Sequence, residues 1–197
     1  MTNDDVENKW NEIYAAKNSP AEKLATSVAN VLKEHAYLLP KSGSALDLAC
    51  GLGANAIFLA NHGLHTHAWD ISEVVIKKLQ TYNKENNLGI VCKICDVEKY
   101  PPVPDSFDVI CISYFLEREL SASIIQALKP DGLLFYQTFI KEKVSDFGPS
   151  NPNYRLQENE LLKLFSSLHV LAYQEYGIVG DINQGLRNVA TLVAQKR

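Results

Sequence analysis

The sequence has few of the features that would indicate a nucleic-acid partner or a membrane. It contains no run of basic residues, and 23 aspartate and glutamate residues outnumber 19 lysine and arginine residues, for a net charge of -4. A surface that follows a phosphate backbone is therefore not expected. The first ten residues are polar and acidic, unlike a secretory signal, and no stretch approaches the roughly 20 apolar residues of a membrane span. These absences predict a soluble cytoplasmic protein with neither a nucleic-acid nor a membrane partner.

Cysteine is also scarce, and its pattern does not favour a disulfide framework. The four cysteines of a chain without a secretion signal are more typical of reduced thiols. Cys92-x-x-Cys95 resembles a redox or zinc motif, but it lies in an expected strand, where this odd spacing directs the side chains to opposite faces. The histidines at 62, 65 and 67 lack a nearby carboxylate ligand in the pattern. We therefore expect no metal site.

The length of the chain and its pattern of apolar residues predict one α/β domain. At 197 residues and 46% hydrophobic composition, one substantial core is expected. Residues 21–35 carry a helical apolar stripe that ends before the break at 40–43, so residues 1–40 are expected to form an N-terminal helical cap. From residue 44 to 197, short apolar runs alternate with segments of helical period, which is the βαβ rhythm of a parallel sheet.

Seven strands and four helices are expected in this core. The strands are expected at 45–49, 64–69, 90–94, 107–112, 133–138 and 168–173 and through 189–193, and the helices at 54–61, at 73–85, around 124–128 and around 161–165. The last two strands are joined by a short glycine-containing connection, which favours an antiparallel hairpin over a parallel crossover. Residues 141–157 form a polar loop of the length that often serves as a lid.

The segment from Asp47 to Gly53 has the pattern of a nucleotide-binding turn. It places a carboxylate near the end of a strand and a glycine pair just before a helix, where the backbone can approach a ligand. Gly51-x-Gly53-x-x-Ala56 alone also suits a dinucleotide, with Asp70 as the expected acidic residue about 20 positions on. A nicotinamide-dependent oxidoreductase, or a glycine turn that binds no ligand, therefore remains open on this motif alone.

Three aspartates at successive strand ends distinguish between the possible ligands. Asp47, Asp70 and Asp96 are all expected at the carboxyl edge of the sheet, where open α/β sheets bind ligands. A pyrophosphate would be repelled by a carboxylate beside the glycines, whereas S-adenosylmethionine carries an ammonium, a sulfonium and no phosphate. Asp70 is suited to accept hydrogen bonds from the ribose hydroxyls, and Asp96 with the Val97 amide can bind the adenine edge. The pattern favours the sulfonium cofactor.

Taken in order, these segments resemble the successive motifs of the class I S-adenosylmethionine-dependent methyltransferases. The motifs that carry the resemblance are LDLACGLGANAIFLA, AWD at 68–70, CDVEKY with Asp96, DSFDVICISYF and LKPDGLLFYQTF. Within that group, Tyr14, Gly53-Ala54-Asn55, Ala68-Trp69-Asp70 and Asn159-Glu160-Leu161 are similar to the tellurite-resistance methyltransferases. Those enzymes pair a histidine with an arginine before the last strand, and residues 180–187 of this chain include Arg187 but no histidine.

The resemblance implies a fold, a cofactor and a set of binding residues. The fold is α/β, a Rossmann-like seven-stranded, mostly parallel sheet with an antiparallel last strand, helices on both faces and an N-terminal helical cap. The cofactor is S-adenosyl-L-methionine, with S-adenosyl-L-homocysteine as its product. The residues expected to bind it are Asp47, Ala49, Gly51, Gly53, Asn55, Asp70, Ile71, Asp96, Val97, Ser113, Trp10 and Tyr14.

The acceptor side is expected after the fourth core strand. Tyr114 and Arg118 are the first substrate-side candidates, and Arg187 could complete the pocket together with the loop residues Phe147, Tyr154 and Arg155. Methyl transfer from a sulfonium is an in-line displacement, and a soft anion hardly needs a general base. We expect a small-molecule acceptor, such as a chalcogen oxyanion or a thiol. A macromolecular methyltransferase and a protein that binds the cofactor without turnover are the remaining alternatives.

Overall fold

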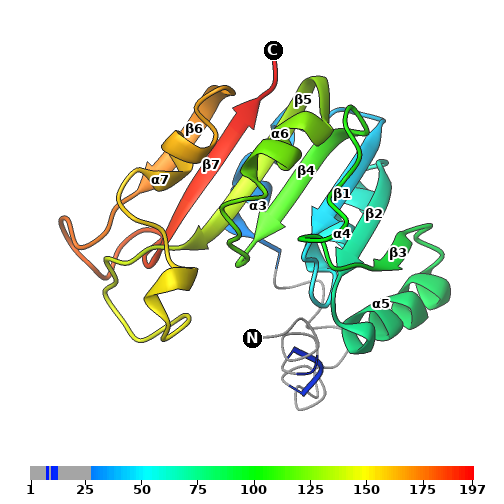
Figure 1. The fold of residues 1–197 in the computed structure, drawn as a ribbon, viewed down its shortest axis with the longest axis horizontal. Helices are drawn as coiled ribbons and strands as arrows, with labels where there is room; N and C mark the ends of the chain where they lie inside the picture. Colours follow the sequence, from blue (N-terminus) through cyan, green and yellow to red (C-terminus); the bar gives the residue numbers. More distant parts are fainter. Residues whose placement is uncertain (1–7, 9, 13–27) are drawn as a thin grey trace.

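The computed structural model describes residue 8, residues 10–12 and residues 28–197 (Figure 1). Tyr14 and most of the helix expected at 21–35 therefore lie outside the described residues. The strands are β1 (Ser44–Leu48), β2 (His65–Asp70), β3 (Val91–Ile94), β4 (Phe107–Ser113), β5 (Leu128–Phe139), β6 (His169–Glu175) and β7 (Val189–Gln195). The helices are α3 (Asn30–Glu34), α4 (Ala54–Asn61), α5 (Glu73–Asn86), α6 (Ser121–Ala127) and α7 (Glu160–Leu164), with short 3-10 turns at Ala36–Leu38 and Pro152–Tyr154.

The seven strands form one sheet in the order β3-β2-β1-β4-β5-β7-β6. The strands β1 to β5 pair in parallel, and β7 pairs antiparallel with both β5 and β6. The predicted seven-stranded sheet and its antiparallel last strand are confirmed. The chain order reverses between β1 and β4, which makes their carboxyl ends the topological switch point where such sheets bind ligands. In Figure 1 the arrowheads of β1 and β4 point to the lower edge of the sheet, where the 141–157 loop also lies.

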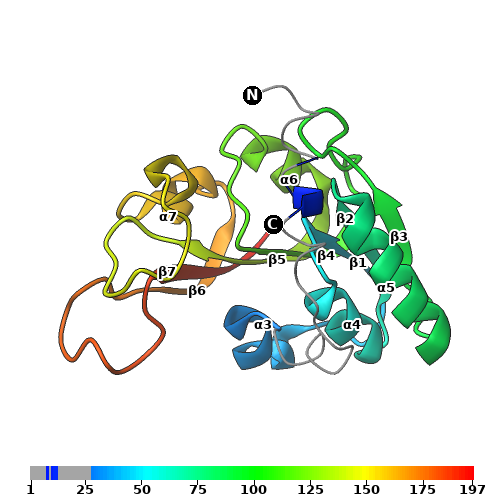
Figure 2. The same cartoon turned by 90° about the horizontal axis from the view of Figure 1, so that it is seen from below.

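Helices cover both faces of the sheet, as predicted (Figure 2). On one face, α3, α4 and α5 pack on residues that alternate along the strands, among them Ala45, Val109 and Phe135. On the other face, α6 and α7 pack on the intervening residues, among them Leu46 and Ile110. Neighbouring strand residues face opposite sides of the sheet, and helices cover both sides. Both sets of residues are therefore apolar, and the parallel strands appear as continuous hydrophobic runs in the sequence.

One strand boundary differs from the sequence prediction. β5 begins at Leu128, not after the expected turn at 129–132. Leu128 already pairs with Phe107 in the parallel ladder, and the register shifts before Val109, so the turn residues lie within the strand as an irregularity. Asp131 has a φ of 64° there, and its N–H donates to the carbonyl of Lys196. Among the described helices, none has the length and hydropathy that crossing a membrane requires.

Candidate cofactor and acceptor site

The loop between β1 and α4 turns through three residues with positive φ. Ala49, Gly51 and Gly53 have φ values of 55°, 53° and 83°, a region that glycine enters without steric cost. A Cβ added to Gly53 would lie 2.6 Å from both Cδ atoms of Leu79 in α5. The glycine at position 53 therefore allows the loop to pack closely against the helix that follows β2.

Asp47 lies beneath this loop, and its contact with the cofactor stays a prediction. Its side chain is completely buried, with 0% of its surface exposed. One carboxylate oxygen accepts a hydrogen bond from the Ala56 N–H at 3.0 Å, and the other accepts one from Asn55 Nδ2 at 3.4 Å. Burial raises the pKa of Asp47 to about 7, although both hydrogen bonds act in the opposite direction. Asp47 holds the first turn of α4 in place under the loop.

Asp70 joins the end of β2 to the glycine loop. One oxygen of its carboxylate accepts from the Gly51 N–H at 2.8 Å, and the other accepts from the Ser72 N–H at 2.9 Å. The side chain is buried, and burial raises its pKa even though these hydrogen bonds lower it in part. The structure therefore brings together two predicted cofactor residues, Asp70 and Gly51. Ile71, which follows Asp70 in the chain, is half-buried.

The third aspartate lies at the next strand end. The Cys95 N–H donates to the carbonyl of Asp70 at 2.8 Å, so the ends of β2 and β3 are adjacent. Asp96 is half-buried, accepts from the Glu98 N–H at 3.1 Å, and lies 3.4 Å from Lys99 Nζ. Val97 is buried. Asp70 and Asp96 thus form a short acidic edge next to the glycine loop.

Asn55 links the cofactor loop to the expected acceptor side. It is 3% exposed, and its Nδ2 donates to Ser113 Oγ at 2.9 Å as well as to Asp47. Its Oδ1 accepts from the Ala29 N–H at 2.9 Å, just before α3. One side chain therefore connects α4, the end of β4 and the segment that enters from the N-terminal side.

Gln137 makes a second connection of this kind that the sequence analysis did not include. It is 1% exposed on β5, its Oε1 accepts from the Val31 N–H at 3.1 Å, and its Nε2 donates to the Tyr114 hydroxyl at 2.9 Å. A glutamine in the apolar run LLFYQTF was the signal that could have identified it, because a buried amide needs partners. Asn55 and Gln137 together fasten α3 to the carboxyl edge of the sheet.

The described part of the N-terminal segment lies at the start of α5. Asn11 Oδ1 accepts from Ser72 Oγ at 2.6 Å and lies 3.5 Å from the Val74 nitrogen. Ser72 also donates its N–H to Asp70, so Asn11 is close to the predicted cofactor edge. Figure 1 draws this short dark-blue segment at the same lower edge of the sheet. Trp10 beside it is 37% exposed.

Tyr114 follows β4 and belongs to a cluster of three rings. It has a φ of 56°, and its side chain is 43% exposed. Its ring centroid lies 4.9 Å from that of Phe139 and 6.4 Å from that of Phe147. The Phe139 and Phe147 centroids are 5.4 Å apart. Burial raises the pKa of the Tyr114 hydroxyl, while the hydrogen bond from Gln137 lowers it in part. We call Tyr114, Phe139 and Phe147 the aromatic cluster.

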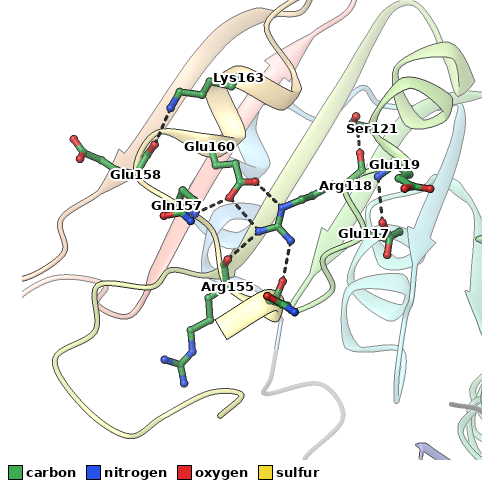
Figure 3. A network of polar contacts seen from close by, with 10 residues as sticks. Glu117, Arg118, Glu119, Ser121, Arg155, Gln157, Glu158, Glu160 and Lys163 are labelled. Atoms are coloured by element: carbon green, nitrogen blue, oxygen red, sulfur yellow. Dashed lines mark hydrogen bonds and ion pairs between the residues drawn. The ribbon is translucent and has the colours of Figure 1, made fainter. Parts of the chain in front are cut away.

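Arg118 was predicted on the acceptor side, but its guanidinium is engaged within the protein (Figure 3). Its Nε lies 2.6 Å from Glu160 Oε1 and its Nη2 lies 3.2 Å from Glu160 Oε2. Nη1 donates to the carbonyl of Asn153 and Nη2 to the carbonyl of Arg155. Burial alone would raise the pKa of Glu160, but Arg118 and the Gln157 N–H lower it overall. This Arg118 network fastens the end of the 141–157 loop to α7.

Arg187 is engaged in a similar way within the β6–β7 loop. Its Nε donates to the carbonyl of Gln184, its Nη1 to those of Gly177 and Val179, and its Nη2 to that of Asp181. The guanidinium also lies 5.4 Å from the Tyr176 ring centroid. A pocket of about 420 Å³ is lined by residues of this loop, Arg187 among them. The hydrogen bonds hold the loop in shape, and a direct contact of Arg187 with an acceptor stays a prediction.

Part of the chain is similar in sequence to known methyltransferases. Residues 45–132 match the family model described as a methyltransferase domain. A relative from Haemophilus influenzae, named "Probable S-adenosyl-L-methionine-dependent methyltransferase TehB", is 27% identical over 165 residues, which cover 77% of this chain and 57% of that protein. YqeM of Bacillus subtilis, named as a methyltransferase, is 29% identical over 154 residues, which cover 74% of this chain and 61% of that protein. This chain thus spans less than two thirds of the length of these curated relatives.

Solved structures show the same fold. The crystal structure of TehB from Haemophilus influenzae superposes with a TM-score of 0.68 at 22% identity and covers 97% of this chain and 67% of that one. The PH0226 protein from Pyrococcus horikoshii superposes with a TM-score of 0.70 at 17% identity and covers 94% and 99%. The family match at residues 45–132 and the named relatives bear out the sequence-based resemblance to the S-adenosylmethionine-dependent methyltransferases, and the solved structures share the fold. TehB is among the relatives, and S-adenosylmethionine is the cofactor of that class.

Proposed function

We propose that this chain transfers the methyl group of S-adenosylmethionine to a small-molecule acceptor and releases S-adenosylhomocysteine. The observation that carries the proposal is the hydrogen bond from the Gly51 N–H to the Asp70 carboxylate, with Asp96 at the adjacent strand end. A cationic cofactor with ribose hydroxyls and an adenine amino group offers partners to such an acidic edge. We propose further that residues 44–197 act as one catalytic unit with residues 1–40 as its cap.

The glycine loop also argues against a pyrophosphate ligand. A phosphate at such a turn is held by backbone N–H groups of the loop and of the helix start. Here the Gly51 N–H donates to Asp70, the Gly53 N–H donates to the carbonyl of Cys50, and the Ala56 N–H donates to Asp47. Two amides of the turn and one of the first helical turn are thus already used by protein oxygens. This favours a phosphate-free cofactor over a dinucleotide.

When bound, the cofactor supplies an electrophilic methyl group on a sulfonium sulfur. The protein's task is to align that methyl group with the acceptor and to exclude water. The backbone of the glycine loop and the carboxylates of Asp70 and Asp96 fix the cofactor side. Ser113 and Tyr114 at the end of β4 define the acceptor side, because β1 and β4 flank the switch point of the sheet. A soft nucleophile, such as a chalcogen oxyanion or a thiol, needs little further assistance.

Calorimetric titration separates this proposal from its rivals. S-adenosylhomocysteine is expected to bind, and NADH is expected not to bind at the same concentration. Binding of NADH without binding of S-adenosylhomocysteine would establish the oxidoreductase alternative. Methyl transfer is then measured with cofactor labelled in its methyl group and a panel of small acceptors, with RNA and protein fractions as controls. Label in RNA or protein alone would show a macromolecular enzyme, and binding without any transfer would favour a non-catalytic binder.

A further inference from the structure

The aromatic cluster leaves ring surface open at the edge of the sheet where the acceptor is expected. Tyr114 is 43% exposed and Phe147 is 60% exposed, although both are large apolar groups. The rings come from three places, the end of β4, the end of β5 and the 141–157 loop. Tyr114 and Phe147 meet at 85°, and Phe139 and Phe147 meet at 67°. Such an arrangement presents both ring faces and ring edges, the surfaces against which a further aromatic group packs.

The cluster is held at the switch point of the sheet. Tyr114 directly follows Ser113, whose hydroxyl accepts from Asn55 at the start of the cofactor-side helix. The Tyr114 hydroxyl is fixed by the buried amide of Gln137. A ligand that packs on Tyr114 would therefore lie on the β4 side of the crevice whose β1 side is the glycine loop.

The 141–157 loop is fastened on both sides of Phe147. On one side, Asn188 Oδ1 accepts from the Val144 N–H at 2.7 Å, and Asn188 Nδ2 donates to Ser145 Oγ at 2.6 Å. On the other side, the Arg118 network holds the carbonyls of Asn153 and Arg155. Between these anchors, a Cβ added to Gly148 would lie 2.7 Å from the Phe139 ring. The loop thus keeps the Phe147 ring next to Phe139.

Two of the three arginines predicted on the acceptor side, Arg118 and Arg187, offer little to an oxyanion. The third, Arg155, is only 9% exposed and donates through Nη2 to the carbonyl of Pro149. A guanidinium has five N–H donors, and bidentate binding of an oxyanion uses two on one edge. Arg118 makes four hydrogen bonds, two of them to the Glu160 carboxylate. Arg187 also makes four, all to backbone carbonyls. Neither retains an edge with two available donors, and the charge of Arg118 is balanced by Glu160.

We propose that the acceptor is a thiol whose sulfur is attached to an aromatic ring, and that this ring packs against Tyr114, Phe139 and Phe147. The inference rests on the proposed methyl transfer and narrows its substrate class. A ring on the acceptor matches the ring surfaces of the cluster. A polarisable sulfur makes favourable contacts at ring edges. A thiolate needs no protein base, because it is itself the nucleophilic form.

The reaction balances without a further reactant. The thiol loses its proton to water before the transfer. A sulfur lone pair of the thiolate then forms a bond to the methyl carbon, while the bond from that carbon to the sulfonium sulfur breaks. The electron pair of the broken bond stays on the departing sulfur, which gives neutral S-adenosylhomocysteine and an aryl methyl thioether.

The test compares the full-length protein on matched acceptors in a labelled-methyl assay. The probes are thiophenol, phenol as the same ring without sulfur, 2-mercaptoethanol as a thiol without a ring, and the oxyanions tellurite and selenite. The inference expects kcat/KM for thiophenol to exceed that for each other probe at least tenfold. Faster methylation of an oxyanion, of phenol or of 2-mercaptoethanol overturns the inference and leaves the proposed methyl transfer standing. Absence of S-adenosylhomocysteine binding by calorimetry overturns the proposed function itself and this inference with it.

Variants of Phe147 locate the contact. Phe147→Ala is expected to raise KM for thiophenol roughly three- to tenfold, the size of one aromatic pair, with kcat within about twofold. Phe147→Trp keeps a ring and is expected to restore KM. Tyr37→Ala removes another exposed aromatic, 78% exposed and outside the cluster, and is expected to change nothing. Unchanged KM in Phe147→Ala, with S-adenosylhomocysteine affinity equal to that of the wild type, would refute the contact.

Discussion

Asn55 Nδ2 lies 2.9 Å from Ser113 Oγ, so one hydrogen bond joins the helix after the glycine loop to the strand end that leads to Tyr114. The same amide also donates to Asp47, and its oxygen accepts from the Ala29 N–H. The cofactor side, the acceptor side and the entering N-terminal segment therefore share one buried side chain. A change at this residue is expected to affect all three.

The first prediction concerns the loss of this amide. Asn55→Ala leaves the Ala29 N–H and one Asp47 oxygen without a protein partner, and each lost buried hydrogen bond costs about 1–3 kcal/mol. We expect a lower free energy of unfolding by urea titration and several-fold weaker S-adenosylhomocysteine binding. Asn61→Ala, at the exposed end of the same helix, is the control. Equal binding by Asn55→Ala and wild type would show that this link does not shape the cofactor site.

The second prediction concerns the pH dependence that Asp47 imposes on stability. Its pKa in the folded protein is about 7, against an ordinary value of 3.8. Between these values the folded protein retains a proton that the unfolded chain has lost. The stability of the wild type therefore falls as pH rises from about 4 to about 7, by at most about 1.4 kcal/mol per pH unit for one group.

Asp47→Asn removes this titration. We expect the difference in free energy of unfolding, wild type minus variant, to decrease from pH 5 to pH 7 and then level off. Asp70, whose pKa burial also raises, is present in both proteins, so its own titration largely cancels in the subtraction. Its charge is the smallest of the causes that shift the pKa of Asp47. Asp146→Asn, at a fully exposed carboxylate, is the matched control. A constant difference for Asp47→Asn would mean that the buried carboxyl does not take up a proton in this range.

The third prediction separates backbone strain from close packing in the glycine loop. Gly53 and Gly89 both have positive φ, 83° and 69°, so alanine at either position costs roughly 1–2 kcal/mol in backbone strain. Only Gly53 has a close neighbour, Leu79, since nothing lies within 4 Å of a Cβ added to Gly89. Gly53→Ala should therefore lose about 1–3 kcal/mol more than Gly89→Ala in urea unfolding. It should also weaken S-adenosylhomocysteine binding, while Gly89→Ala should not.

The fold was predictable because its signals are local. The expected helix at 54–61 has the same bounds in the structure, where Gly53 is its N-cap. The strand ends of β1 and β2 lie within one residue of the expected positions. The burial of Asp47 could also be predicted from the sequence. Strand alternation directs Leu46 and Leu48 to one face of the sheet and Asp47 to the other, under α4. Asp47 lies in β1 next to its carboxyl end, as predicted, with its side chain on the α4 side.

The partners of the long polar side chains were not predictable in this way. Arg118 pairs with Glu160, 42 positions away, and Gln137 binds the backbone of Val31, 106 positions away. No local pattern encodes such contacts, because they depend on how α7 and α3 pack on the finished sheet. For the same reason the arginine positions alone suggested an anion site, whereas most of their donors hold loops together.

The last prediction tests whether Arg118 positions the 141–157 loop or binds the acceptor. Glu160→Gln weakens the Arg118 network but leaves the Arg118 residue itself unchanged. If Arg118 only positions the loop, Arg118→Ala and Glu160→Gln should have the same effects. Both should speed tryptic cleavage within the loop several-fold. Both should raise acceptor KM and lower stability by roughly 1 kcal/mol or less, since the Arg118 side chain is 36% exposed. Glu73→Gln, in the exposed ion pair with Lys77, is the control and should leave the loop unchanged. A large KM effect in Arg118→Ala with none in Glu160→Gln would instead establish direct contact with the acceptor.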